Sequence, residues 1–202
     1  MRQPDDMEEI NSTVKIYYQS LLEILGEKKA RAIFSQMGLS NPEVNIQELK
    51  IPLPNILEGL AAALSNEYGE LACQGLLIRM GRASISFFRH HYKSIAALGN
   101  IENRLQPIEK RFLFSLTALA NLVTRETRIE IEVIQENTRQ FLWKMFLNEK
   151  KDKKGNLSPY YYFGVLEEFC FWLDARKNYQ LSYLADKRKK VVEIAIEIRP
   201  QG

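Results

Sequence analysis

Arg79 and Arg82 are the first residues whose types and spacing indicate chemistry, because they lie three residues apart in a stretch with helical periodicity. Residues three apart on a helix share one face. Two guanidinium groups on one face can hold a carboxylate or a phosphate between them. The alternative is a pair of solvated or salt-bridged arginines, and the sequence leaves both interpretations open.

Other catalytic patterns are weak or missing. His90 and His91 are the only histidines, and neighbours on a helix point about 100° apart, which is poor geometry for chelating one metal ion. We therefore interpret them as a solvated helix end. The sequence contains no phosphate-cradling glycine loop, paired-cysteine metal motif or nucleophile elbow. We expect no catalytic residue, no metal ligand and no cofactor.

Aromatic side chains gather in the segments that should form the core. They indicate either a packed core with a dimer interface or an apolar pocket for a flat or long hydrophobic ligand, and the sequence favours neither. In the second interpretation, the predicted ligand-binding residues are Arg79, Arg82, Phe87, Trp143, Phe146, Phe163 and Phe169.

Five helices should come before residue 128, because apolar residues recur at three- and four-residue steps. The first should end near Gly26 and the second near Gly38, where a positive φ is tolerated. Gly75 and Gly81 lie inside a long helix from about residue 70 to 92 and cost about 1 kcal/mol each relative to alanine. They predict a close approach to a neighbouring helix or to a ligand.

From Arg128 the apolar period changes to two, which is typical of strands. Strands are predicted at 128–135 and 139–147, then a helix from Ser158, then two strands ending near Ile198. The segment 139–147 is apolar on both faces, which indicates cover on both sides, a partner subunit or a cavity. We expect an α+β fold of about five helices followed by ββαββ, with a four-stranded antiparallel sheet and helices on one face.

Composition sets broad limits on the protein. A chain of 202 residues that is 46% hydrophobic is long enough for one domain covering residues 1–202. The net charge of +3 demands no anionic partner, and the basic clusters at 150–154 and 187–190 make nucleic acid only a minor option. No segment reads as a membrane span or a secretory signal, so we expect a cytoplasmic protein. Cys73 and Cys170 are expected to be buried reduced thiols.

The segment from Glu67 to Arg82, followed by Phe87, resembles the central helix of the 4-vinyl reductase, or hydrocarbon-binding, domain family. Residues 25–39 resemble the helices that often precede that domain, and residues 164–167 with 193–198 match its C-terminal pattern. The resemblance implies a fold shared with TRAPP-type trafficking subunits and haem nitric-oxide sensors, often dimeric. It divides the chain into a helical extension and proline-containing connection, 1–54, and an α+β core, 55–202.

This chain also departs from that family. Residues 148–159 contain no cysteine, whereas many relatives have a cysteine cluster there, so the family's metal site is not carried over. Relatives also have a glycine-aspartate turn and a cysteine between the last two strands, and this chain has neither there. The word reductase is no evidence of catalysis.

The leading hypothesis is a non-catalytic, sensor-like domain that binds a small hydrophobic molecule, lipid-like or aromatic, between the long glycine-bearing helix and the sheet. We expect a homodimer. The rival hypothesis is a protein-interaction or scaffold subunit that uses strand 139–147 as its dimer or partner interface. A role in tetrapyrrole metabolism, as an enzyme or an accessory protein, is third.

Overall fold

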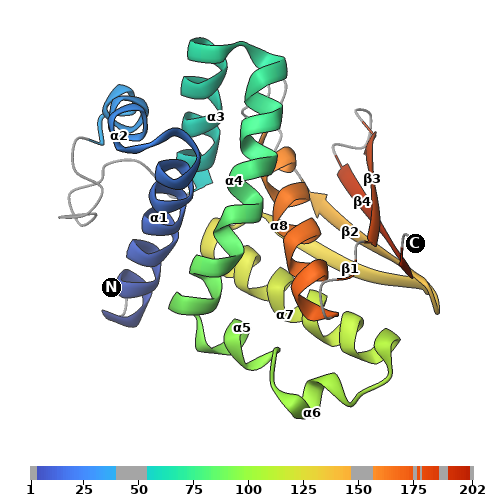
Figure 1. Cartoon of the computed structure of the whole chain (residues 1–202). Helices are drawn as coiled ribbons and strands as arrows, with labels where there is room; N and C mark the ends of the chain where they lie inside the picture. The colour runs from blue at the N-terminus through green and yellow to red at the C-terminus, as the bar shows by residue number, and fades with distance from the viewer. Residues whose placement is uncertain are drawn as a thin grey trace. The chain divides into compact units, whose positions relative to one another are not determined.

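The computed structural model describes residues 4–39, 54–146, 157–174, 177, 179–186 and 191–200 (Figure 1). The chain divides into two compact units, residues 1–91 with 156–165 and residues 92–155 with 166–202. The expected single domain and its boundary near residue 54 stay predictions. The two basic clusters, at 150–154 and 187–190, lie outside the described residues.

The first unit is helical. Gly26 (φ 78°) separates its first two helices, and Gly38 (φ 77°) follows the second, so both predicted helix ends are confirmed. Gly69 (φ 83°) separates the next two. The helices of this unit are α1 (Pro4–Leu25), α2 (Glu27–Gln36), α3 (Pro54–Tyr68), α4 (Glu70–His91) and the first half of α8 (Ser158–Leu173).

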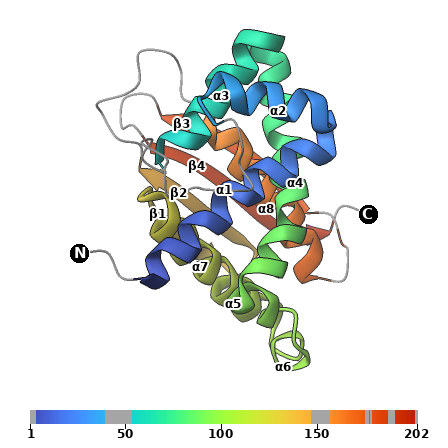
Figure 2. The same cartoon turned by 90° about the vertical axis from the view of Figure 1, so that its left-hand side faces the viewer.

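Within this unit α4 and α8 touch backbone to backbone, and they lie side by side in Figures 1 and 2. A Cβ atom at Gly81 would meet the Tyr161 carbonyl oxygen and lie 2.7 Å from the Val165 nitrogen. A Cβ atom at Gly164 would lie 2.8 Å from the Ile78 carbonyl carbon. The predicted close approach is thus confirmed at Gly81, and the neighbour is a helix.

At Gly75 the predicted approach of a neighbouring helix is wrong. That residue is exposed, and nothing lies within 4 Å of the place where its Cβ would be. Helical period alone separates the two positions, since Gly81 falls on the buried face of α4 and Gly75 on the opposite one.

The second unit begins with three helices, α5 (Lys93–Ala97), α6 (Ile101–Arg104) and α7 (Ile108–Thr127). In the described residues seven helices therefore precede the first strand, and the expected five missed α5 and α6. These have five and four residues, too few to show a helical period. No helix in the described ranges is long and apolar enough to cross a membrane.

Four antiparallel strands form one sheet, as predicted. Their order in the sheet is β1-β2-β4-β3. The helix-covered face is the one that carries Phe141, since Phe112 of α7 stacks on Phe141 with ring centroids 6.3 Å apart and meets Tyr179 edge-on at 5.2 Å. α7 packs along β1 (Figure 2). The strands are β1 (Glu130–Asn137), β2 (Gln140–Phe146), β3 (Tyr179–Asp186) and β4 (Val191–Pro200).

The opposite face of β2 is mixed rather than fully apolar. Leu142 is buried there, while Lys144 pairs with Glu193 at 3.1 Å and Phe146 is 38% exposed. The prediction that this strand is apolar on both faces is therefore confirmed for Leu142, whereas Phe146 is partly exposed.

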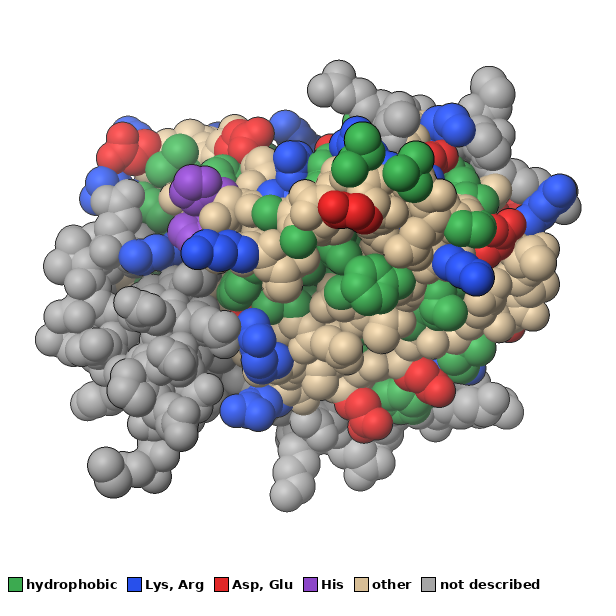
Figure 3. Space-filling view, turned by 90° about the horizontal axis from the view of Figure 1, so that it is seen from below, with side chains coloured by type: hydrophobic (Ala, Val, Ile, Leu, Met, Phe, Trp, Pro, Cys, Tyr) green, Lys and Arg blue, Asp and Glu red, His purple; other side chains and the backbone are tan. Residues whose placement is uncertain are grey.

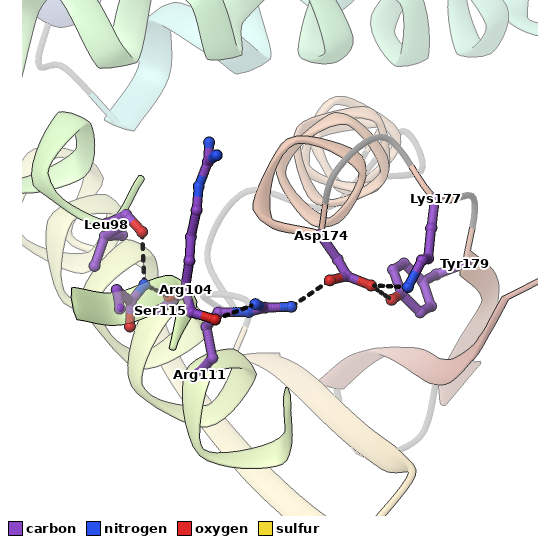
Figure 4. Close-up of polar contacts among 8 residues, drawn as sticks. Leu98, Arg104, Arg111, Ser115, Asp174, Lys177 and Tyr179 are labelled. Carbon is purple, nitrogen blue, oxygen red and sulfur yellow. Dashed lines mark hydrogen bonds and ion pairs between the residues drawn. The ribbon is translucent and has the colours of Figure 1, made fainter. Parts of the chain in front are cut away.

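A buried charged network joins α7, the end of α8 and β3 in the second unit (Figure 4). The Asp174 carboxylate accepts hydrogen bonds from the Arg111 guanidinium and the Tyr179 hydroxyl, and Lys177 Nζ lies 3.3 Å from it. Arg111 also donates to the carbonyl of Arg104 at 3.2 Å. Arg111 and Asp174 are both buried, so each charge depends on the other for stabilisation.

The network sets which groups are ionised. Burial acts to raise the pKa of Asp174, but the Tyr179, Lys177 and Arg111 contacts together hold that pKa below its ordinary value of 3.8. Burial, followed by the neighbouring Asp174 carboxylate, raises the pKa of Tyr179. At neutral pH the carboxylate is charged and the phenol keeps its proton.

Exchanging glycine for alanine should separate the two kinds of helical glycine. Gly81→Ala and Gly164→Ala should each lower the free energy of unfolding by ~2 kcal/mol or more, because backbone atoms occupy the space. Gly75→Ala is the matched control in α4 and should raise it by ~1 kcal/mol. Urea unfolding measures all three, and equal effects at positions 75 and 81 would contradict the crossing.

Replacing Asp174 by asparagine should destabilise the protein in a pH-dependent way. Removing one partner of a buried ion pair costs about 3–5 kcal/mol. Since the folded pKa of Asp174 is lowered, its contribution is complete above pH 3.8 and disappears as pH falls through that lowered pKa. Wild type and Asp174→Asn should therefore converge in acid.

The control is Glu27→Gln, which removes the exposed Glu27–Arg31 pair (2.8 Å) and should change stability by less than ~1 kcal/mol. Urea unfolding across a pH series measures both variants. A stability difference between wild type and Asp174→Asn that stays constant down to the lowest pH would show that the Asp174 charge contributes nothing.

Candidate functional site

Four of the predicted ligand-binding residues lie in the first unit. Arg79 and Arg82 are exposed on α4, on the side away from its buried face. Phe87 on α4 and Phe163 on α8 are half-buried. Because the arginines point away from the buried face, that geometry suits an anion at the surface better than the polar end of a buried ligand.

The first unit also holds a buried hydroxyl cluster that the sequence did not predict. Tyr161 on α8 donates to Ser84 Oγ on α4 at 2.8 Å, and Ser84 Oγ lies 2.8 Å from Ser20 Oγ on α1. The two serines also donate to the carbonyls of Met80 and Ile16 in their own helices, at 2.8 and 2.7 Å. The sequence signal that could have indicated this cluster is a serine among the apolar residues of each helix, Ser20 in α1 and Ser84 in α4. The cluster ties three helices together through neutral groups.

The other three predicted residues lie in the second unit, and the structure does not bring them all to one face. Trp143 on β2 and Phe169 on α8 are buried, and Phe146 is the partly exposed residue described above. Trp143 and Phe146 are three residues apart on one strand, so they point to opposite faces of the sheet. The role of all seven residues as ligand contacts stays a prediction, as does the pocket expected between α4 and the sheet.

Trp143 on β2 carries a buried hydrogen-bond donor. It is 1% exposed, and its Nε1 has no hydrogen-bond partner. A buried donor without an acceptor costs about 1–3 kcal/mol. Such an unpaired group in a folded chain calls for an explanation.

The buried Asp174 carboxylate, the Ser20 and Ser84 hydroxyls and the two thiols do not act as a free general base or nucleophile. The Asp174 carboxylate is occupied by donors, and the Ser84 and Ser20 hydroxyls contact other hydroxyls and carbonyls. Cys73 and Cys170 are free and buried, as predicted. Burial raises the pKa of Cys73 to about 11 and also raises that of Cys170, so both are neutral thiols, which are poor nucleophiles.

Solved H-NOX domains share this architecture. One is an oxygen-binding H-NOX domain related to soluble guanylate cyclases, in its oxygen complex, with a TM-score of 0.64, 11% identity and coverage of 94% of this chain and 95% of that one. A variant of H-NOX from T. tengcongensis has a TM-score of 0.64 and 12% identity, and the match covers 94% of this chain and 98% of that one. A third structure, described by its work on heme redox potential and porphyrin distortion, has a TM-score of 0.65 and 11% identity, and the match covers 95% of this chain and 96% of that one. No protein-family model matches the chain, and no curated protein matches it.

The histidines do not fit heme, the group that this fold implies. Both are in the last turn of α4 with rings 5.4 Å apart, and Figure 3 shows them (purple) at the surface. His90 is exposed. His91 is half-buried, and its pKa is lowered by partial burial, by His90 and by Lys15. Charged and polar neighbours do not supply the apolar walls that a porphyrin needs.

The two cysteines and Tyr179 fit no better as axial ligands. Thiolate ligation requires an ionised cysteine, and both thiols are neutral, with Cys73 donating to the Ala61 carbonyl at 3.3 Å. Tyr179 is bound to Asp174. No group of three metal-ligating side chains occurs in the part of the chain that the structure describes. The chain thus has the H-NOX fold, while its histidines, its two thiols and Tyr179 do not fit heme iron.

Proposed function

We propose that this chain is a non-catalytic domain that binds or senses a small hydrophobic molecule without a metal. The observation that carries the proposal is the H-NOX fold, matched over 94–95% of the chain, in a protein whose histidines, thiols and Tyr179 do not fit heme iron. One of the similar domains is described as binding oxygen, so a ligand-binding role is consistent with the architecture.

The chemistry of the second unit supports an apolar ligand. Its helix-covered sheet face carries aromatic and aliphatic side chains, with the unpaired indole N–H of Trp143 among them. Small-molecule sites are mostly apolar with a few placed polar groups. The predicted contacts Trp143 and Phe169 belong to this unit.

A scaffold role is the second candidate, and the structure suggests another surface for it. Most apolar side chains of β2 are already buried, which argues against strand 139–147 as the partner interface. Ile101, Leu105 and Phe114, on and beside α6 and α7, are 71%, 79% and 58% exposed. Figure 3 shows exposed apolar side chains interspersed with charged ones on one face. Exposed apolar patches often mark protein contacts.

Native mass spectrometry of freshly purified protein tests the proposal. We expect an organic small molecule that is released on denaturation. Hemin added to the reduced protein should give no iron–histidine stretching band in resonance Raman spectra, because neither histidine is set in an apolar pocket. The variant His90→Ala/His91→Ala should behave like wild type.

Two results would count against it. A stoichiometric heme complex whose iron–histidine band disappears in His91→Ala would make the protein a heme binder. An oligomer that never carries a small molecule, and that dissociates in Leu105→Ser/Phe114→Ser, would favour the scaffold role.

A further inference from the structure

The surroundings of Trp143 limit what can meet its indole N–H. In the sheet register Trp143 lies between Val133 of β1 and Ile194 of β4. Phe141 and Met145 flank it on the same face of β2, and both are fully buried. Gln135, at a diagonal position on β1, is exposed. The indole donor therefore sits in an apolar part of the sheet.

Water is a poor partner for this donor. A buried water molecule typically makes about three hydrogen bonds, and the backbone groups of these strands are paired in the sheet. Trp143 Nε1 would be its one side-chain partner among the cross-strand and flanking residues named above. An apolar molecule that carries a single acceptor atom would satisfy the indole and keep the remaining contacts apolar.

A charged ligand is also disfavoured. A buried carboxylate or phosphate needs an opposite charge, and Arg111, the buried cation among the described residues of this unit, is already paired with Asp174. An indole is a neutral donor. The matching acceptor is the oxygen of a ketone, an ester or an ether.

We propose that Trp143 is the polar contact of the ligand and that the ligand is an uncharged, mainly apolar molecule with one acceptor oxygen. This rests on the proposed function and specifies its ligand class. The indole N–H donates to that oxygen, and the bond supplies the partner that the N–H lacks in the ligand-free chain.

The test is a cycle of two probes and three proteins. Acetophenone and ethylbenzene have nearly the same shape and differ by one carbonyl oxygen. Their affinities are measured by titration calorimetry for wild type, Trp143→Phe and the matched control Trp172→Phe. In parallel, the indole proton of Trp143 is followed by NMR, identified as the resonance that Trp143→Phe lacks.

Acetophenone should lose about tenfold in affinity in Trp143→Phe, equivalent to ~1.4 kcal/mol for one hydrogen bond. Ethylbenzene should bind wild type and Trp143→Phe equally, which also shows that the variant folds. Trp172→Phe should match wild type for both probes. Acetophenone, and not ethylbenzene, should move the Trp143 indole proton downfield.

The outcomes distinguish an error in the proposed ligand class from an error in the proposed function. If ethylbenzene binds and Trp143→Phe changes both affinities equally, or the indole proton does not move, the ligand class is wrong while hydrophobic binding stands. If neither probe binds wild type, the proposed function fails as well.

Discussion

The contact between α4 and α8 at Gly81 and Gly164 is the constraint on which the first unit depends. Two helices can approach until their backbones touch only where neither has a side chain, and here both positions are glycine. Ser84 lies one turn after Gly81, and Tyr161 one turn before Gly164. The close crossing is therefore what brings the Tyr161 hydroxyl to within 2.8 Å of Ser84, and any added side chain would separate them.

Buried polar groups are treated in two different ways in this protein. In the hydroxyl cluster and around Asp174, each carboxylate or hydroxyl meets a donor or acceptor from another element, so the cost of burial is offset by hydrogen bonds. Trp143 Nε1 is buried without that compensation. Asn103 Oδ1 and Arg111 Nε of the same unit are also buried without a hydrogen-bond partner, and each such group calls for an explanation.

The H-NOX architecture and heme chemistry are separable in this chain. A fold supplies layers and helix positions, whereas an axial ligand needs a particular side chain in an apolar setting. This chain shares the fold of the H-NOX domains, and its two histidines lie in the last turn of α4. The expected relation to haem nitric-oxide sensors is confirmed as a shared fold, and the 4-vinyl reductase family stays a prediction.

The sequence by itself determined the elements, because hydrophobic period and glycine position are local properties. It placed the ends of α1 and α2, the change from helix to strand near Arg128 and the antiparallel four-stranded sheet, and it missed α5 and α6, which are too short to show a period. Only the tertiary structure decided which helix Gly81 touches, which three groups contact Asp174 and which indole is left without a partner. Such contacts join residues up to 77 positions apart in the sequence. They depend on tertiary packing, which no local sequence pattern encodes.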